Sequence, residues 1–539
     1  MLRKSVVTVC ALLLFACRSA EPRLEHSSSD ASATAPVGEP AADGGAAAGE
    51  LVPLVDAGPA DSGTLGVIDA GIADAGAPGV VIADAGAGDA GLVDAGSFDA
   101  GAPDPGAADA GARDAGTADA GSAQLPPISP GLMPATASGW SPFSARPQSA
   151  PALTTSAGSS GYILDVAGQG GASVYGGFTA HINRLQGSAW YRFQAHAVPR
   201  GIDSLRKSVT IVLRWSGTFG EEVSPDYIWD YQPQADGSML FDRAIQAPAG
   251  TTAVDVQLAL QWSPNGGVAF DRLGFTPQTA PPSRKVRVAA IYARPSGAQS
   301  GYQAVQQAGQ YAQQVAATSH PDVMVMGELL NTVGFAGTLD SEAETIPGPS
   351  SDYLASIARS CQVNIVFGMV EKAGNLLFNA AVLIDRNGTI IGKHHKVQLP
   401  LAEASSGISP GSAVEVFDTD FGKVALLICQ ETSFPEPARE AALKGAEMLL
   451  VPIWGGRQTL VHARAMENGL YLAASGYDYS SEVVDPLGNV LASAAIGGAP
   501  TVALADIDLG KRFREDWLGD WRDISAKERW TAPYGYQLP

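Results

Sequence analysis

Three segments between residues 138 and 280 alternate hydrophobic with polar side chains, namely 189–195, 208–215 and 254–262. A repeat of two is typical of half-buried antiparallel strands, because successive side chains of a strand point to opposite faces of its sheet. Clusters of Gly, Pro and Asn separate the segments, as turns between strands would. The pattern therefore predicts an all-β sandwich module over residues 138–280.

Strand and helix patterns alternate after the Pro-Pro linker at 281–282. Buried strands are predicted over 286–291 and 322–326, with a helix around 302–318 between them. The alternation continues to the end of the chain, which favours an α/β domain over residues 285–539.

The N-terminus has the pattern of a targeting signal. Two basic residues at positions 3 and 4 precede an apolar run over 6–15 that is too short to span a bilayer. The run ends in Leu-Phe-Ala-Cys, which resembles a bacterial lipobox and implies that residues 1–16 are removed and Cys17 is lipidated. A plain signal peptide that happens to contain a cysteine is the alternative. Arg18, rather than an inner-membrane retention Asp, follows the cysteine, so we expect anchoring in the outer membrane.

Residues 17–137 are predicted to be a disordered tether between this anchor and the folded part. Asp-Ala-Gly recurs there with a period of five from Asp84 to Asp119, and large apolar side chains are sparse. The chain has 34 Lys+Arg and 55 Asp+Glu, a net charge of −21. The stretch 18–124 supplies about −15 of it, which favours an extended, self-repelling spacer. The net negative charge of the chain argues against nucleic acid as a partner, because nucleic acid carries charge of the same sign.

Four polar residues of the C-terminal domain stand where catalytic side chains are expected. Glu328 ends an apolar strand, Lys396 follows a strand–turn–strand over 381–392, Glu403 comes shortly after, and Cys429 ends the strand over 424–428. A thiol is a poor nucleophile at neutral pH and needs a base within hydrogen-bond reach. A carboxylate supplies that base, and an ammonium group suits a developing oxyanion.

This order of residues resembles the nitrilase superfamily of carbon–nitrogen hydrolases, which places Glu, Lys and Cys at the ends of three strands. Further pieces match in order; they lie at 378–380, 444–452, 462–469 and 485–488. The resemblance implies a four-layer α-β-β-α sandwich for residues 285–539. Separately, the strand pattern of residues 138–280 resembles the all-β, jelly-roll-like modules that often bind carbohydrate. It also implies an amidase-like enzyme that hydrolyses a non-peptide carbon–nitrogen bond of a small amide through a Cys thioester.

The resemblance also assigns roles to the site residues. Glu328 is the general base and acid, Lys396 the oxyanion partner and Cys429 the nucleophile. Glu403 matches the family's second glutamate and is expected to orient Lys396 or the substrate. The Gln430 N–H is a second oxyanion donor. Two more expectations concern side chains nearby: Trp454 lines the substrate pocket, and Arg464 and Glu467 form an ion pair on a helix.

Several alternatives remain open at this point. After the nucleophile the family usually has an aromatic or small residue and then Asp or Glu, whereas this chain has Gln430 and then Glu431. Because true nitrilases favour an aromatic residue at the first of these positions, we expect an amide substrate ahead of an N-carbamoyl or nitrile one. A catalytically idle hydrolase fold with a carbohydrate-binding module over 138–280 is the rival. Trp140, Trp229 and Tyr231 could stack on sugars or could be core and interface residues. No metal or cofactor is expected, and the family commonly pairs its sheets across a homodimer.

Overall fold

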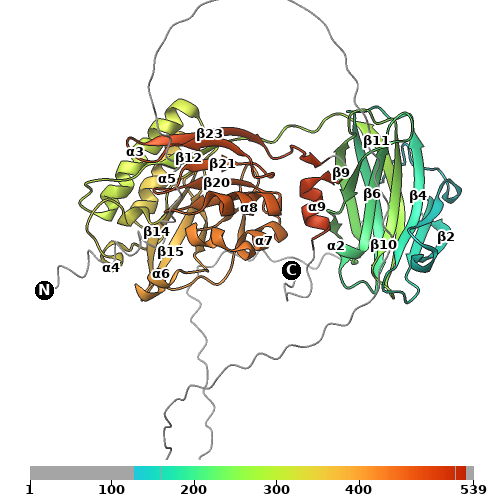
Figure 1. The fold of residues 1–539 in the computed structure, drawn as a ribbon, viewed down its shortest axis with the longest axis horizontal. Coiled ribbons are helices and arrows are strands. Elements are labelled where there is room, and N and C mark those ends of the chain that lie inside the picture. The colour runs from blue at the N-terminus through green and yellow to red at the C-terminus, as the bar shows by residue number, and fades with distance from the viewer. Residues whose placement is uncertain (1–126, 159–160, 516–517, 530–539) are drawn as a thin grey trace, which may run out of the picture. The chain divides into compact units, whose positions relative to one another are not determined.

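The computed structural model describes residues 127–158, 161–515 and 518–529 (Figure 1). The predicted signal peptide, the predicted lipidation site at Cys17 and the predicted tether up to residue 126 lie outside the described residues. Among the described helices, none has both the length and the apolar composition needed to cross a membrane.

The module that begins the described part consists of two antiparallel sheets. Its first sheet runs in the order β1 (Ser141–Ser144), β4 (Tyr175–Asn183), β10 (Ala253–Gln261), β6 (Val209–Ser216), β7 (Glu222–Ile228). Its second runs β2 (Ala152–Gly158), β3 (Gly161–Ala167), β11 (Gly267–Gln278), β5 (Trp190–Arg200), β9 (Met239–Gln246), β8 (Gln232–Pro233). The three alternating segments of the sequence are therefore confirmed as strands: β5, β6 and β10.

The inward-facing side chains of both sheets form one hydrophobic core, as the period of two requires. Trp215 and Tyr191 belong to it, and the Tyr191 ring stacks on Phe275 at 5.0 Å between centroids. Trp140 is also buried in this core, and its indole donates to the Tyr162 hydroxyl at 2.9 Å. Trp140 therefore takes the core role that the sequence left open, and it presents no exposed ring to a sugar.

The domain from residue 285 onward contains two six-stranded mixed sheets. The first has the order β16 (Ile390–His395), β15 (Leu376–Ile384), β14 (Asn364–Ala373), β13 (Val323–Val325), β12 (Lys285–Tyr292), β23 (Thr501–Asp508). The second has the order β17 (Val416–Asp418), β18 (Lys423–Leu426), β19 (Met448–Pro452), β20 (Tyr471–Ser475), β21 (Ser481–Val484), β22 (Val490–Ala494). The central three strands of each sheet are parallel and the outer ones antiparallel.

Helices and alternating side chains define two cores around these sheets. Along β12, Val286, Val288 and Ala290 join residues of the second sheet, together with α7 (Pro435–Leu443) and α8 (Gln458–Asn468). The intervening Ala289 and Ile291 pack with α3 (Gly301–Ser319) and α5 (Pro349–Cys361). The predicted alternation of strands and helices is confirmed. Each central strand is buried on both faces, because its side chains serve the two cores in turn.

Ion pairs join the module to the C-terminal segment, which we define as residues 509–515 and 518–529 and which includes α9 (Trp521–Lys527). Asp523 accepts from both Trp229 Nε1 at 3.0 Å and Arg243 Nη2 at 2.8 Å. Asp226, whose side chain is fully buried, pairs with Arg514 at 2.7 Å. Module and domain belong to the same compact unit. Trp229 is therefore an interface residue.

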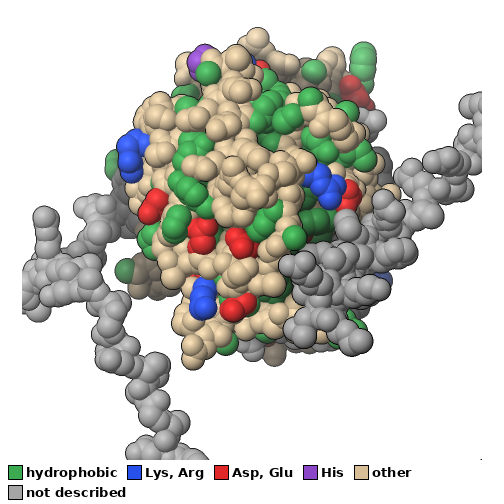
Figure 2. All heavy atoms as spheres, turned by 90° about the vertical axis from the view of Figure 1, so that its left-hand side faces the viewer, with side chains coloured by type: hydrophobic (Ala, Val, Ile, Leu, Met, Phe, Trp, Pro, Cys, Tyr) green, Lys and Arg blue, Asp and Glu red, His purple; other side chains and the backbone are tan. Residues whose placement is uncertain are grey.

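Figure 2 looks at the side of the molecule on which α3, α4 (Leu339–Glu342) and α5 lie in Figure 1. Acidic, basic and hydrophobic side chains are interspersed there among neutral polar atoms. No charge of one sign covers the part of this face that the structure describes. This face therefore has no obvious electrostatic preference for a partner.

Candidate active site

Glu328 follows β13 in the turn that leads to η3 (Leu330–Thr332). Its main chain is held against β14, since Gly368 N donates to Gly327 O at 3.0 Å. A Cβ on Gly368 would stand 2.7 Å from Glu328 Cα, so the close approach of the two chains requires glycine there. Leu329 adopts a left-handed conformation with φ 48°. The carboxylate is consequently buried at a sharply defined position.

Lys396 comes directly after β16, and its amide donates to Asn379 O on β15 at 2.9 Å. Its side chain is as buried as that of Glu328. The ammonium group donates to Glu328 Oε1 at 2.9 Å and to Glu403 Oε1 at 2.5 Å. Glu403 lies on α6 (Leu401–Ser405). The structure thus brings these three predicted residues together from three separate segments.

Asn379 completes this cluster, although no role beyond a family match is predicted for it. Its Nδ2 donates to Glu328 Oε1 at 2.7 Å and to Glu403 Oε2 at 3.1 Å. The amide therefore fixes the orientation of both carboxylates. A polar residue within the otherwise apolar run of β15 was the signal that could have identified it, because a buried amide needs partners.

The charges of the cluster favour a protonated Lys396 and raise the pKa of Glu403. Burial alone would lower the pKa of Lys396, but Glu328, Cys429 and Glu403 together raise it well above its ordinary value. Burial raises the pKa of Glu403, and the neighbouring Glu328 adds to this, while Lys396 opposes both. Two carboxylates against one ammonium leave an excess negative charge, which a proton or a developing cation would relieve.

Cys429 begins η4 (Cys429–Ser433), three residues after β18 ends. It has φ 43°, a left-handed conformation that is rare outside glycine and marks a tight turn. Its buried Sγ lies 3.3 Å from Gly455 O. The charge of Cys429 is one of the causes that raise the pKa of Lys396. Gln430, the next residue of η4, is half-exposed.

Glu431 connects the cysteine turn to the lysine strand and is a residue whose role the sequence analysis missed. It is fully buried. Its carboxylate accepts from Ile428 N, Val397 N and His394 Nε2, each at 2.8 Å. Burial would raise its pKa, but these bonds, led by that from His394, hold the pKa below its usual range. A carboxylate two residues from the nucleophile, flanked by apolar strands, was the available signal.

Aromatic side chains border the site on the side of β19 and β20. Trp454 immediately precedes Gly455, whose carbonyl accepts from Cys429. It packs edge-on against Tyr477 at 5.2 Å between centroids. The buried Tyr477 ring lies over Gly327, next to Glu328. Its hydroxyl has no hydrogen-bond partner among the described residues. Burial and the charge of Glu328 raise the Tyr477 pKa, so the hydroxyl keeps its proton and can donate.

Histidines near the lysine have hydrogen-bonding and packing roles. His395 stacks on Phe378 at 4.0 Å and bonds Glu371 at 2.6 Å, while His394 holds Glu431. No group of three or more metal-ligating side chains occurs within the described part of the chain. The predicted ion pair on α8 is confirmed, with Arg464 Nη1 2.5 Å from Glu467 Oε1.

Comparisons with known proteins identify relatives of this domain. Residues 287–512 match the family described as carbon–nitrogen hydrolase. The omega-amidase NIT2 of Bos taurus is 32% identical over 195 residues, which is 31% of this chain and 70% of that protein. A hydrolase of Schizosaccharomyces pombe is 31% identical over 36% of this chain and 68% of its own length. The crystal structure of Saccharomyces cerevisiae Nit3, a member of the nitrilase superfamily, matches with a TM-score of 0.38 and 25% identity, covering 42% of this chain and 90% of that one.

Proposed function

The chain belongs to the carbon–nitrogen hydrolase family, and from this premise we propose that it hydrolyses the carbon–nitrogen bond of a small amide through a thioester on Cys429. The observation that carries the proposal is the buried Lys396 ammonium bonded to Glu328 and Glu403, in a domain whose Cys429 is buried on a tight turn and acts electrostatically on the same ammonium. A nucleophile, a base and an oxyanion partner are then available in one enclosed site.

The acylation step uses each of these groups once. Glu328 removes the thiol proton, and the Cys429 sulfur forms a bond to the amide carbon. Lys396 and the Gln430 N–H stabilise the oxyanion that develops. Glu328 then returns the proton to the departing nitrogen, the carbon–nitrogen bond breaks, and ammonia or an amine leaves. The product on the enzyme is a thioester.

Deacylation repeats the proton transfers with water as the nucleophile. Glu328 takes a proton from water, the new carbon–oxygen bond forms, and the carbon–sulfur bond breaks to release the acid. The thiolate recovers its proton from Glu328. Glu403 and Asn379 are positioning residues in this scheme, because their bonds hold Lys396 and Glu328 in place.

The substrate class follows from the relatives and from the wall of the site. Among the relatives are omega-amidases, so we propose a primary amide ahead of an N-carbamoyl or nitrile substrate. Trp454 and Tyr477 provide an apolar wall near the nucleophile. The unpaired Tyr477 hydroxyl is then available to a polar atom of the substrate.

We also propose an organisation for the whole chain. Lipidation at Cys17 anchors it to the cell envelope, preferably the outer membrane, and residues 17–126 form the spacer. The predicted tether boundary at 137 is too late, because Met133 is buried in the core of the module and Leu132 N donates to Phe275 O at 2.7 Å. The module over 138–280 is a jelly-roll-like sandwich, and the domain over 285–539 has the α-β-β-α layering of the family. The two shared cores around the sheets support that layering. Homodimer formation and sugar binding by the module are further parts of this proposal.

Active-site labelling distinguishes the enzyme from an idle binding protein. We expect a chloromethyl ketone amide analogue to modify Cys429 selectively and a Glu328→Gln variant to react much more slowly. Cys361, the other described thiol, lies at the end of α5 and serves as the internal control. Equal labelling of both thiols, unchanged by Glu328→Gln, would refute the proposed function.

A further inference from the structure

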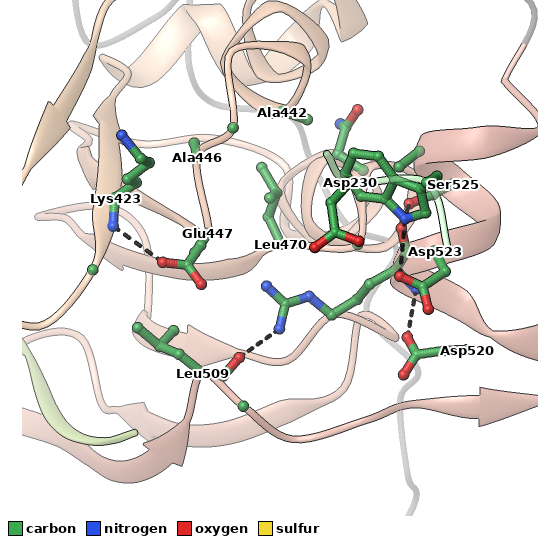
Figure 3. A pocket seen from close by; sticks show the side chains of 18 of the residues that line it. Asp230, Lys423, Ala442, Ala446, Glu447, Leu470, Leu509, Asp520, Asp523 and Ser525 are labelled. Atoms are coloured by element: carbon green, nitrogen blue, oxygen red, sulfur yellow. Dashed lines mark hydrogen bonds between the residues drawn. The ribbon is translucent and has the colours of Figure 1, made fainter. Parts of the chain in front are cut away.

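A cavity that is separate from the cluster around Lys396 lies where the module meets the C-terminal segment. Its volume is about 960 Å³ (Figure 3). Module side chains that line it include Arg206, Trp229 and Tyr231. In Figure 3, Asp520 and Asp523 lie together on one side and Glu447 on the other. We call this cavity the basic pocket.

Basic side chains outnumber acidic ones in the walls of the basic pocket. Nine Lys and Arg residues line it, against five Asp and Glu residues. Five of the nine have a carboxylate partner within 4 Å: Arg243, Arg284, Lys423, Lys444 and Arg512. This local excess of positive charge stands in a chain whose net charge is −21.

The other four cations of the basic pocket form no ion pair within 4 Å among the described residues, although Glu447 acts electrostatically on Arg522 and Glu467 on Arg529. Arg206 lies over the Trp229 ring at 4.9 Å, and Lys511 lies over the Phe513 ring at 4.9 Å. Two more donate to main-chain carbonyls, Arg522 to Leu509 O at 2.7 Å and Arg529 to Glu467 O at 2.7 Å. The guanidinium groups of Arg206, Arg522 and Arg529 each retain donors that an anion could accept from.

Some of these cations also repel one another. Burial lowers the pKa of Arg529 to about 10, and the charges of Arg439 and Arg206 contribute to this. Lys527 is buried outside the pocket lining and donates to the carbonyls of Arg206, Lys207 and Val209. Burial, with a further contribution from Arg206, lowers its pKa to about 7. An anion in the pocket would relieve this repulsion.

We propose that the basic pocket binds an organic anion with at least two phosphate or carboxylate groups, held by Arg206, Arg522 and Arg529. Guanidinium groups pair with both kinds of oxyanion through two parallel hydrogen bonds. Trp229 and Tyr231 provide an apolar surface for the part of the ligand that carries no charge. Because the module and the C-terminal segment both supply side chains that bind the anion, binding would also stabilise the contact between them.

Calorimetric titration of the full chain tests this inference. The probes are pyrophosphate and citrate at constant ionic strength, which distinguish phosphate from carboxylate recognition. Binding of at least one of them with 1:1 stoichiometry is expected. An Arg522→Gln variant should weaken that binding by about tenfold, the effect of one charged hydrogen bond. Binding of neither probe, or stoichiometry well above one, would overturn the inference.

Two further variants separate a specific pocket from general attraction and from misfolding. Lys372→Gln removes an exposed positive charge from β14 in the catalytic domain, outside the lining of the pocket, and should leave the affinity unchanged. Lys511→Gln removes an exposed charge from the pocket lining at little structural cost and should again weaken binding. An equal loss for Lys372→Gln and Lys511→Gln would contradict the proposed site. Amide hydrolysis is not required for any of these results.

Discussion

Replacing Glu431 by Gln should destabilise the catalytic domain and disarrange its active site together. The buried carboxylate accepts from two main-chain amides and from His394, at the point where the Cys429 turn meets the strand that ends at Lys396. Glutamine keeps one side-chain oxygen and has an NH2 group in place of the other. At least one buried N–H therefore loses its acceptor and faces another donor. Losing such a buried charged acceptor costs about 3–5 kcal/mol.

Thermal unfolding provides the assay for this loss of stability. For a domain of this size, the free-energy change corresponds to a decrease in Tm of about 10 °C. Glu436→Gln, on the exposed side of the helix that follows, is the matched control and should change Tm by less than about 2 °C. A Tm for Glu431→Gln equal to that of this control would refute the reasoning. Activity should fall as well, because the turn and the strand are no longer held in register.

The same substitution has a defined pH dependence. The pKa of Glu431 is lower in the folded protein than in the unfolded chain. The ionised Glu431 therefore contributes fully to the free energy of unfolding at pH values above its pKa in the unfolded chain, about 4.3. This contribution is lost as the pH falls through the lower pKa of the folded protein. The stability difference between wild type and Glu431→Gln should stay constant from pH 8 to 5 and narrow below pH 4. A difference that widens in acid would contradict the assigned direction.

Three further predictions concern single positions. Tyr477→Phe removes a buried hydroxyl with no described protein partner, so it should leave Tm unchanged and raise KM by up to about tenfold in steady-state kinetics; a fall in Tm with unchanged KM would contradict this. Gly368→Ala places a Cβ 2.7 Å from Glu328 Cα and should lower kcat by about tenfold or more, with the displacement visible in a crystal structure; full activity would mean that the base tolerates movement. Cys17→Ser should abolish incorporation of a labelled fatty acid and release the protein from the membrane fraction, and retained label would exclude this anchor site.

The elements that the sequence could predict are those fixed by local pattern. Strands β5, β6 and β10 follow from alternation, and α3 follows from its helical period. Glu328, Lys396 and Cys429 could be selected because each follows a predicted strand and their order along the chain matches the family, although Cys429 follows a strand of the second sheet and the other two follow strands of the first. The sequence therefore predicts that Lys396 lies close to Glu328 and Glu403.

Long-range hydrogen bonds account for what the sequence could not predict. No local pattern predicts a structural role for Glu431. Its role is apparent only from the hydrogen bonds that its carboxylate accepts from the amides of Val397 and Ile428. The contact of Asp523 with Arg243 joins residues 280 positions apart, and no local pattern encodes that pairing. The basic pocket depends on it, since module and C-terminal segment must be in contact for the cavity to exist.

Mass spectrometry of the acid-quenched enzyme tests the central claim most directly. The full chain is incubated with a panel of small primary amides, ammonia release is measured, and the peptide containing Cys429 is weighed after rapid quenching. We expect that the mass of the Cys429 peptide increases by the acyl group of any amide that the enzyme hydrolyses. The Cys429→Ala variant should release no ammonia and acquire no acyl group. Undiminished ammonia release by Cys429→Ala, or an acyl group on another residue, would contradict it.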